Sequence, residues 1–237
     1  MSPAPFRSTL HRLTFCWVFY LAFVVFASAA SAAVTYTYDN QHRLTAAVYN
    51  DGARVQYTYD VTGNRLASLS TSATSRTYED AEDGLIVGWD IYDNDPAGAT
   101  ITTVYDNDRA SRVIELTGSA SNNGYRLRDA DSSYWDDTNF KTLEWSMKYS
   151  ESFTVYIAAQ TKNGFRYLYY TPVATSSLGT ETYVHHGVGV TMKNGAWHTL
   201  TRNLEQDLKE AQPDNELQAV LGFLIRGSGR VDDVKTK

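Results

Sequence analysis

The stretch that decides the fold runs from Lys141 to Pro172 and reads KTLEWSMKYSESFTVYIAAQTKNGFRYLYYTP. It holds three runs of alternating side chains separated by short polar breaks. In the first run, for example, Leu143, Trp145 and Met147 share one face. Such period-two alternation, rich in aromatic and β-branched residues, predicts half-buried strands. Asn163-Gly164 supplies residues that tolerate a positive φ, which a tight hairpin needs. We therefore expect a three-stranded antiparallel meander in the middle of a β-sandwich.

The chain on either side of this stretch repeats the strand pattern. One helix is predicted over 204–211, where Leu204 and Leu208 lie one turn apart and Pro213 follows. Short alternating runs between turn signals predict further strands near residues 85–92, 100–105, 112–116, 125–128, 182–188, 197–203, 219–226 and 230–235. About ten short strands with one short helix indicate an all-β sandwich or jelly roll over residues 78–237.

Residues 1–33 have the pattern of a secretory signal peptide. Arg7 and Arg12 precede an apolar run, Leu13 to Phe26, and small residues follow it. The run is short for a membrane span, which needs roughly 20 apolar residues. A retained N-terminal anchor is the alternative. We expect a secreted or periplasmic protein that has lost Cys16, the only cysteine, and so forms no disulfide.

The charge of the chain after residue 33 limits its partners. The full sequence has 21 basic and 27 acidic residues, and Arg7 and Arg12 are the only charged residues of the first 33. The remainder therefore carries 19 basic residues against 27 acidic ones, a net charge of −8. An acidic chain without a basic cluster argues against nucleic acid as a partner.

An internal repeat follows the leader. Tyr36-Thr37-Tyr38-Asp39 recurs as Tyr57-Thr58-Tyr59-Asp60, and each copy leads to an Arg-Leu pair. These residues resemble the YD repeat of the RHS and teneurin-like proteins, although the first copy has His42 where glycine is usual. In that family long arrays build a β-shell, but two copies over 34–68 are too few to stand alone. They are either a remnant or a strand pair that docks onto a larger RHS-type protein. Residues 69–77 are small and hydroxyl-rich, and predict a linker.

The two ends of the main domain are acidic. It opens with Tyr-Glu-Asp-Ala-Glu-Asp-Gly at 78–84 and closes with Val-Asp-Asp-Val at 231–234. This pairing resembles the galactose-binding-like jelly rolls, which include many carbohydrate-binding modules. In those folds the first and last strands commonly share a structural calcium ion, and clustered carboxylates suit Ca²⁺. The resemblance implies a calcium site made by Glu79, Asp80, Glu82, Asp232 and Asp233. Solvated turn residues are the alternative.

Aromatic and polar side chains predict a ligand-binding face. Flat aromatic rings stack on the apolar faces of sugars while polar groups fix the hydroxyls. If the three strands of the meander pair in register, its polar face carries Glu144, Lys148, Tyr156, Gln160, Arg166 and Tyr170. Trp135 and Tyr134 lie in a polar loop, DADSSYWDD, and are expected to reach the ligand as well.

No catalytic motif is present in the sequence. His185 and His186 are adjacent on a predicted strand, so they point to opposite faces and cannot easily share one metal ion. The preferred interpretation is an exported, non-catalytic, glycan-binding jelly-roll module whose partner is a polysaccharide or a cell-envelope glycan. Docking through the YD repeats is one alternative. The other is a polysaccharide lyase that uses Arg166, Tyr167, Tyr170 and His185.

Overall fold

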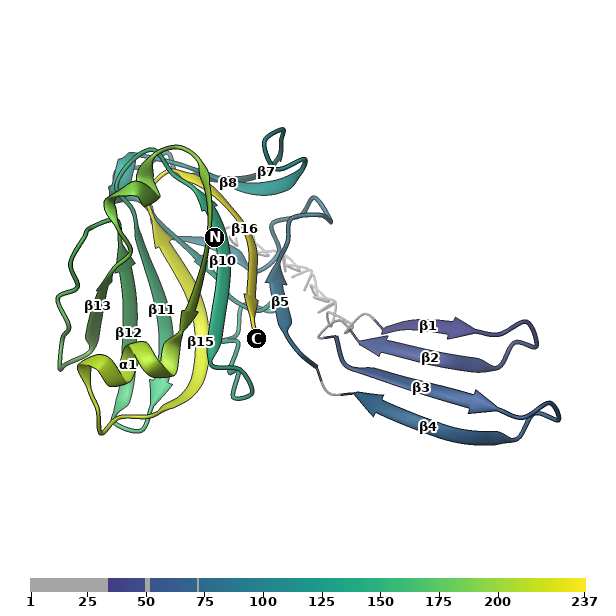
Figure 1. Ribbon diagram of the computed structural model, residues 1–237. Coiled ribbons are helices and arrows are strands. Elements are labelled where there is room, and N and C mark those ends of the chain that lie inside the picture. The colour runs from purple at the N-terminus through teal and green to yellow at the C-terminus, as the bar shows by residue number, and fades with distance from the viewer. Residues whose placement is uncertain (1–33, 50–51, 72) are drawn as a thin grey trace, which may run out of the picture.

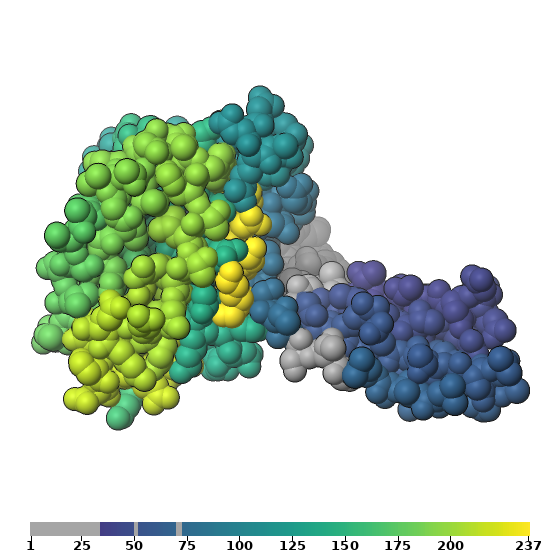
Figure 2. All heavy atoms as spheres, in the orientation of Figure 1, coloured from purple at the N-terminus to yellow at the C-terminus, as the bar shows by residue number. Residues whose placement is uncertain are grey.

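The computed structural model describes residues 34–49, 52–71 and 73–237, and the predicted signal peptide lies outside these ranges. The described chain forms three β-sheets (Figure 1). The first is a single antiparallel layer made by β1 (Val34–Tyr38), β2 (Leu44–Tyr49), β3 (Arg54–Tyr59) and β4 (Arg65–Thr71). It extends away from the other two sheets, which form the sandwich, and Figure 2 shows it as a separate lobe.

Two six-stranded sheets make the sandwich. One, called here the terminal sheet, has the order β14-β10-β16-β8-β7, and β5 also pairs with β16. Its strands are β5 (Arg76–Glu79), β7 (Thr100–Asp106), β8 (Ser111–Thr117), β10 (Thr142–Lys148), β14 (Trp197–Asn203) and β16 (Gly229–Thr236).

The other sheet, called here the tyrosine sheet, has the order β13-β12-β11-β15-β9-β6. Its strands are β6 (Trp89–Asp93), β9 (Gly124–Leu127), β11 (Thr154–Thr161), β12 (Gly164–Thr171), β13 (Tyr183–Gly187) and β15 (Leu217–Arg226). The architecture is thus the predicted all-β sandwich, completed by α1 (Leu204–Ala211) and two 3₁₀ turns, η1 (Ala120–Asn122) and η2 (Val190–Lys193).

The predicted meander is only partly correct. β11 and β12 pair as an antiparallel hairpin, and Gly164 after its turn has a φ of +92°. The first run, β10, lies instead in the terminal sheet between β14 and β16. Tyr149 and Phe153, both buried, mark the segment that carries the chain from one sheet to the other. Alternation shows which side chains face inward, but it does not show which strand lies next to which.

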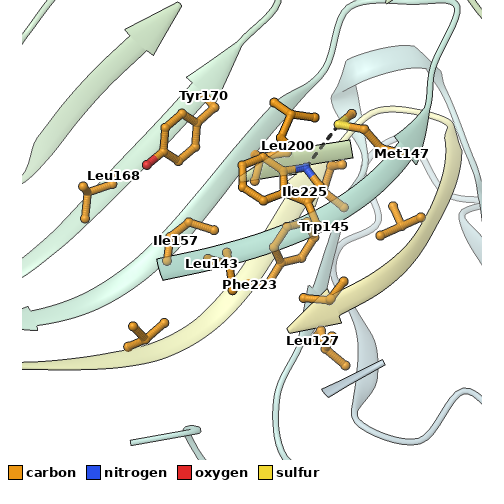
Figure 3. Close-up of a cluster of buried hydrophobic side chains, with 14 of the residues drawn as sticks. Leu127, Leu143, Trp145, Met147, Ile157, Leu168, Tyr170, Leu200, Phe223 and Ile225 are labelled. Carbon is orange, nitrogen blue, oxygen red and sulfur yellow. Dashed lines mark hydrogen bonds between the residues drawn. The ribbon is translucent and has the colours of Figure 1, made fainter. Parts of the chain in front are cut away.

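The core fills the space between the two sheets of the sandwich (Figure 3). Trp145 at its centre is fully buried, and its ring lies 5.6 Å from that of Tyr170 and 6.0 Å from that of Phe223. Its indole Nε1 points at the sulfur of Met147, 3.3 Å away. Such large aromatic contacts hold the two sheets together.

Helix α1 has the predicted bounds, because local signals define both of its ends. The side chain of Asn203 accepts a hydrogen bond from the backbone N–H of Gln206, which caps the helix start. Leu204 and Leu208 are buried against the sandwich, as their spacing predicts. No helix of the described residues is long and apolar enough to cross a membrane.

The two repeats form matching hairpins. Asp39 accepts hydrogen bonds from the backbone of Arg43, and Asp60 does so from the backbone of Asn64. His42 and Gly63 occupy the same place in the two turns and both have positive φ, +58° and +98°. A histidine thus takes the left-handed conformation that favours glycine in the second copy. Strands β4 and β5 reach into the predicted linker, which they shorten to residues 72–75.

Candidate ligand-binding face

The outer face of the tyrosine sheet gathers partly exposed aromatic rings. Val155 and Ile157 on β11 are buried in the core, so Tyr156 between them points away from it. Tyr156 pairs with Tyr169 on β12 and with Leu224 on β15. The resulting set, called here the tyrosine face, comprises Tyr92, Tyr156, Tyr167, Tyr169 and Tyr183.

These rings hold one another in place. Tyr156 stacks on Tyr169 with 5.5 Å between ring centres, and Tyr167 stacks on Tyr183 at the same distance. Tyr156 and Tyr167 meet edge to face at 5.7 Å. Below them, Ala158, Ala219, Leu221 and Leu224 form a small apolar cluster. Rings that are already fixed lose little conformational entropy when a ligand binds.

A shallow groove crosses this face. Its volume is about 230 Å³, and it is lined by Tyr92, Tyr156, Tyr167, Tyr183, Leu224 and Arg226. Tyr92 reaches the groove because its neighbour on β9 is Gly124: a Cβ at that position would lie 2.4 Å from the Tyr92 ring. The guanidinium of Arg226 lies over the ring of Tyr92, 5.7 Å from its centre.

The charged groups of this face are paired. Arg126 donates two hydrogen bonds to Asp90, of 3.0 and 2.7 Å, and these bonds raise the pKa of Arg126. Arg226 donates to Asp93 through both of its terminal nitrogens, one of them at 2.9 Å. Burial raises the pKa of Tyr92 to about 12, so its hydroxyl stays protonated at neutral pH. The face therefore presents hydroxyl donors and acceptors between neutralised ion pairs.

Three of the predicted binding residues lie on or beside this face. Tyr156 is at its centre, and Gln160 stands on the same side of β11, four residues further along. Tyr134 is exposed at the loop that follows β9. Burial is the main cause of the raised pKa of Tyr167, and the hydrogen bonds to Asp90 are the main cause of the raised pKa of Arg126; Tyr134 adds to both effects. Tyr134 therefore lies beside the groove and does not line it.

Trp135 was expected to be exposed, and that prediction is wrong. Its side chain is only 2 % exposed and stacks on Tyr78 with 3.6 Å between ring centres. Its backbone N–H donates to Leu221 on β15, and Asp137 forms a bridge with Val220. The polar loop therefore runs beside β15 in line with β9, which pairs with the next part of β15, and turns its one tryptophan inward.

The predictions for Tyr170 and Arg166 are also wrong. Tyr170 pairs with Val155, which places it on the core side, where it is fully buried. Arg166 pairs with Ala159, also on the core side, and its Nε donates to the side chain of Gln212 at 2.9 Å. A shift of one residue in the expected register exchanges the two faces of a strand.

Glu144 and Lys148 lie in the other sheet, so they do not belong to this face. Glu144 accepts hydrogen bonds from Lys237 and Thr201. Lys148 donates to Asp108 at 2.5 Å. Both side chains make these bonds on the outside of the terminal sheet. They are absent from the tyrosine face because β10, which carries them, does not pair with β11.

The four residues suggested for a lyase, Arg166, Tyr167, Tyr170 and His185, lie on different sides of the sheet. Tyr167 is on the tyrosine face, and His185, which contacts Tyr169 at 4.7 Å, belongs to that face too. Tyr170 and Arg166 are on the core side of β12. Four groups divided between two sides of a sheet cannot meet one substrate.

Sequence reasoning missed Tyr92, Tyr169 and Tyr183 and did not include Tyr167 among the binding residues. The positions of Tyr169 and Tyr167 could have been predicted from the turn after β11. Thr161 pairs with Gly164 across a two-residue turn. Counting back from that pair puts Tyr156 opposite Tyr169 and Ala158 opposite Tyr167. Tyr183 comes from a parallel partner strand, β13, whose register no local signal gives.

The predicted calcium ligands are not brought together. Glu79 is buried and accepts hydrogen bonds from the backbone of Ala81 and, at 2.7 Å, from the indole of Trp89. Asp232 and Asp233 are both paired with Arg109, so an arginine supplies the positive charge at this end of the domain. Asp80 and Glu82 lie in an exposed turn. This arrangement does not fit a calcium ion held by all five residues.

Another group has the composition of a metal site. Within the described residues, one group brings together three side chains of the types that bind metals, with all their ligand atoms within 4.8 Å of one another. It consists of His186, Asp207 and Glu210. They could hold a metal ion, but Asp207 already accepts two hydrogen bonds from Arg202, at 2.8 and 2.5 Å, and one from Tyr170. His186 and Glu210 are the two ligands left for an ion.

A larger cavity, of about 350 Å³, lies beside β5. Its wall includes Arg76 and Asp129, which pair with each other at 3.2 Å. Arg76 also covers the ring of Tyr78, 4.9 Å from its centre. This cavity has no row of exposed aromatic rings, and so the smaller groove is the better candidate for a ligand.

No model of a known protein family matches the sequence, and no curated protein matches it significantly. Among solved structures, the family 11 carbohydrate-binding module of the cellulosomal cellulase Lic26A-Cel5E of Clostridium thermocellum is similar. Its TM-score is 0.42 at 13% identity, over 70% of this chain and 95% of that one. The CBM27-1 module of Caldicellulosiruptor saccharolyticus, solved with mannohexaose, has a TM-score of 0.37 at 15% identity, over 70% and 98% of the two chains. TM-scores below 0.5 describe a likeness in the layout of the strands and carry no information about ligands.

Proposed function

We propose that this protein binds a neutral polysaccharide across the tyrosine face. The observation that carries the proposal is the row of mutually stacked tyrosine rings along an open groove. Flat rings contact the apolar faces of sugar units, and tyrosine hydroxyls exchange hydrogen bonds with sugar hydroxyls. A groove that is open along the sheet admits a chain rather than a single small molecule.

The charge of the face selects the kind of polysaccharide. Arg126 and Arg226 are each neutralised by an aspartate, so neither is free to bind a carboxylate or sulfate on the ligand. A neutral glycan can bind without breaking either ion pair. An acidic glycan would have to break these ion pairs. We therefore expect neutral glucans, mannans or xylans to bind better than polyuronates.

The protein is proposed to bind without catalysis. The groove lining contains no carboxylate among the described residues, and Asp90 and Asp93 of the same strand as Tyr92 are both held by arginines. Glycoside hydrolysis generally needs one carboxyl group as an acid and a second as a base or nucleophile. A panel of soluble polysaccharides incubated with the protein should release no new reducing ends or unsaturated sugars.

Export accompanies this function in our proposal. A basic segment, an apolar run and small residues precede the first described strand. Such a segment would direct the chain to the periplasm or the medium, where polysaccharides are found, and would then be removed. Mass spectrometry of the purified protein should find an N-terminus near Ala32 or Ala33, and an intact N-terminus would contradict export through cleavage.

Tyr167→Ala is the substitution that tests binding directly. Tyr167 contacts Tyr156, Phe165 and Tyr183, so its removal opens the middle of the groove. We expect at least 2 kcal/mol of binding free energy to be lost, roughly a 30-fold rise in Kd. Affinity electrophoresis finds the ligand among neutral polysaccharides, and calorimetry measures Kd. Tyr105→Ala is the control, since Tyr105 is 60 % exposed on the other sheet. Equal losses for both variants would refute this site.

Gly124→Ala tests how Tyr92 is positioned. The added Cβ would overlap the Tyr92 ring and push it out of the groove. We expect Kd to rise about tenfold, the loss of one good contact. Tyr92→Ala should weaken binding to a similar extent, and the double variant should bind no more weakly than Tyr92→Ala alone. Additive effects of the two substitutions would show that Gly124 acts in another way.

A further inference from the structure

The sheet β1–β4 contains one joint between two equivalent repeats. Each hairpin has a register shift after the same position, between Thr37 and Tyr38 in the first and between Thr58 and Tyr59 in the second. The repeats are therefore equivalent at an offset of 21 residues along their whole length. Strands β2 and β3 join them, with Ala46 opposite Gln56 and Ala47 opposite Val55.

Among the residues that the structure describes, neither edge of this sheet has the partner that the repeat predicts. By the same offset, β4 corresponds to β2, and β5 corresponds to the strand that pairs with it, β3. In the structure β5 pairs with β16 in the sandwich instead. Strand β4 is left at the edge of its sheet, as is β1 at the opposite edge.

The two edge strands also lack the usual protection against pairing. Proteins guard exposed edges with lysine, inward charges, proline or bulges. Strand β1 reads VTYTY, and β4 reads RLASLST, in which Arg65 at the start is the one charged residue. The bulge in each hairpin lies next to the turn, so the remainder of both edges is regular.

We infer that β1 of a second copy pairs antiparallel with β4, and that this pairing repeats the β2–β3 joint between chains. The offset sets the register: Ala67 lies opposite Thr35 of the second copy, and Ser68 opposite its Val34. Both pairs are uncharged, as are Ala46–Gln56 and Ala47–Val55 within the chain. Added main-chain hydrogen bonds supply the affinity, as they do when a peptide extends a sheet.

Such an assembly is head-to-tail, because two different edges meet. Each added copy leaves one free β1 and one free β4, so growth continues instead of closing as a dimer. Every copy carries its own tyrosine face, and linked copies would bind a long polysaccharide with increased avidity. The assembly itself does not depend on the polysaccharide.

The first experiment measures the mass of the purified chain by ultracentrifugation from low to high micromolar concentration. We expect the average mass to rise with concentration beyond that of a dimer. Blocked variants carry proline in an edge strand. N–H groups of a strand alternate in direction, so one of Ala67→Pro and Ser68→Pro blocks the outer edge of β4 without breaking the hairpin. Thr35→Pro and Tyr36→Pro serve in the same way for β1, and circular dichroism identifies the folded variant of each pair.

Mixing the two blocked variants decides between head-to-tail pairing and its alternatives. Each variant alone should be monomeric, and an equimolar mixture should form a dimer and nothing larger. If the β4-blocked variant still dimerises alone, β1 pairs with its own copy, and the proposal is overturned. A mixture that stays monomeric, or a wild-type chain that stays monomeric at every concentration, would overturn it as well.

Discussion

Asp207→Ala is expected to destabilise the sandwich by about 3 kcal/mol, the low end of the cost of breaking a buried ion pair. Asp207 is only 4 % exposed and accepts hydrogen bonds from Arg202 and from the hydroxyl of Tyr170, the latter at 2.6 Å. Its removal leaves a guanidinium without its partner and a fully buried hydroxyl with no acceptor. The melting temperature should fall by roughly 6–12 °C for a domain of this size.

A matched control lies one turn away on the same helix. Glu210 is exposed, and its closest approach to His186 is 3.8 Å. Glu210→Ala should therefore change the stability by less than about 1 kcal/mol. Asp207→Asn should give an intermediate loss, since an amide oxygen can still accept from Tyr170. Calorimetry of the three variants checks the order, and equal melting temperatures for Asp207→Ala and Glu210→Ala would contradict it.

Addition of Zn²⁺ to the same variants tests the metal group independently. If His186 and Glu210 hold an ion, the melting temperature of the wild type should rise with Zn²⁺, and that of Glu210→Ala should not. Asp207 offers its oxygens to Arg202 in the structure, so we expect at most a small rise.

Local patterns predicted the elements of the fold well. Helix α1 has the bounds that the spacing of Leu204 and Leu208 and the following proline indicated. Most strand limits follow the alternation, as at 197–203, which is β14, but the strand expected near 85–92 begins only at Trp89. The order of the strands in each sheet did not follow from these patterns. Strand β10 pairs with strands that begin 55 and 87 residues after it, at Trp197 and Gly229, and the free energy that places it there comes from packing around Trp145.

The outward-facing side chains of the β11–β12 hairpin were predicted only in part. The expectation that Tyr156 points outward depended only on its own strand, and the structure agrees. The partners of Tyr156 depended on the register across a turn, where an error of one residue put Tyr170 in place of Tyr169. Trp135 shows a different limit: its polar neighbours gave no sign that Tyr78, 57 residues earlier, would stack on it.

The acidic ends illustrate why charge patterns alone do not predict an ion. Asp232 and Asp233 were expected to need a cation, and Arg109 provides one from a turn more than a hundred residues earlier. The sequence shows how many carboxylates lie near a strand end. It does not show which basic side chain the fold brings to them.

Glu79 should make the protein less stable as the pH rises through the range from 4.5 to 7. Burial raises its pKa from 4.5 to about 7, while hydrogen bonds from Ala81 and Trp89 act in the opposite direction. Between these values the folded protein holds a proton that the unfolded chain has released. Stability from this group is therefore full below pH 4.5 and lost by about pH 7, and the loss is about 3 kcal/mol at 1.36 kcal/mol per pH unit.

The control separates Glu79 from the other titrating groups. Asp232 also has a raised pKa through burial, and His185 has a lowered one, so both contribute to the pH profile of the wild type. The difference between the profiles of the wild type and Glu79→Gln isolates Glu79. We expect chemical denaturation to show that difference changing by about 3 kcal/mol between pH 4.5 and pH 7.

A direct readout of the same proton is available at Trp89. Its indole N–H donates to the Glu79 carboxylate at 2.7 Å, so the nuclear magnetic resonance signal of that N–H should titrate with the carboxylate. The midpoint should lie near pH 7 in the wild type, and the titration should disappear in Glu79→Gln. A midpoint near 4.5 would mean that the two hydrogen bonds to the carboxylate offset the whole cost of its burial.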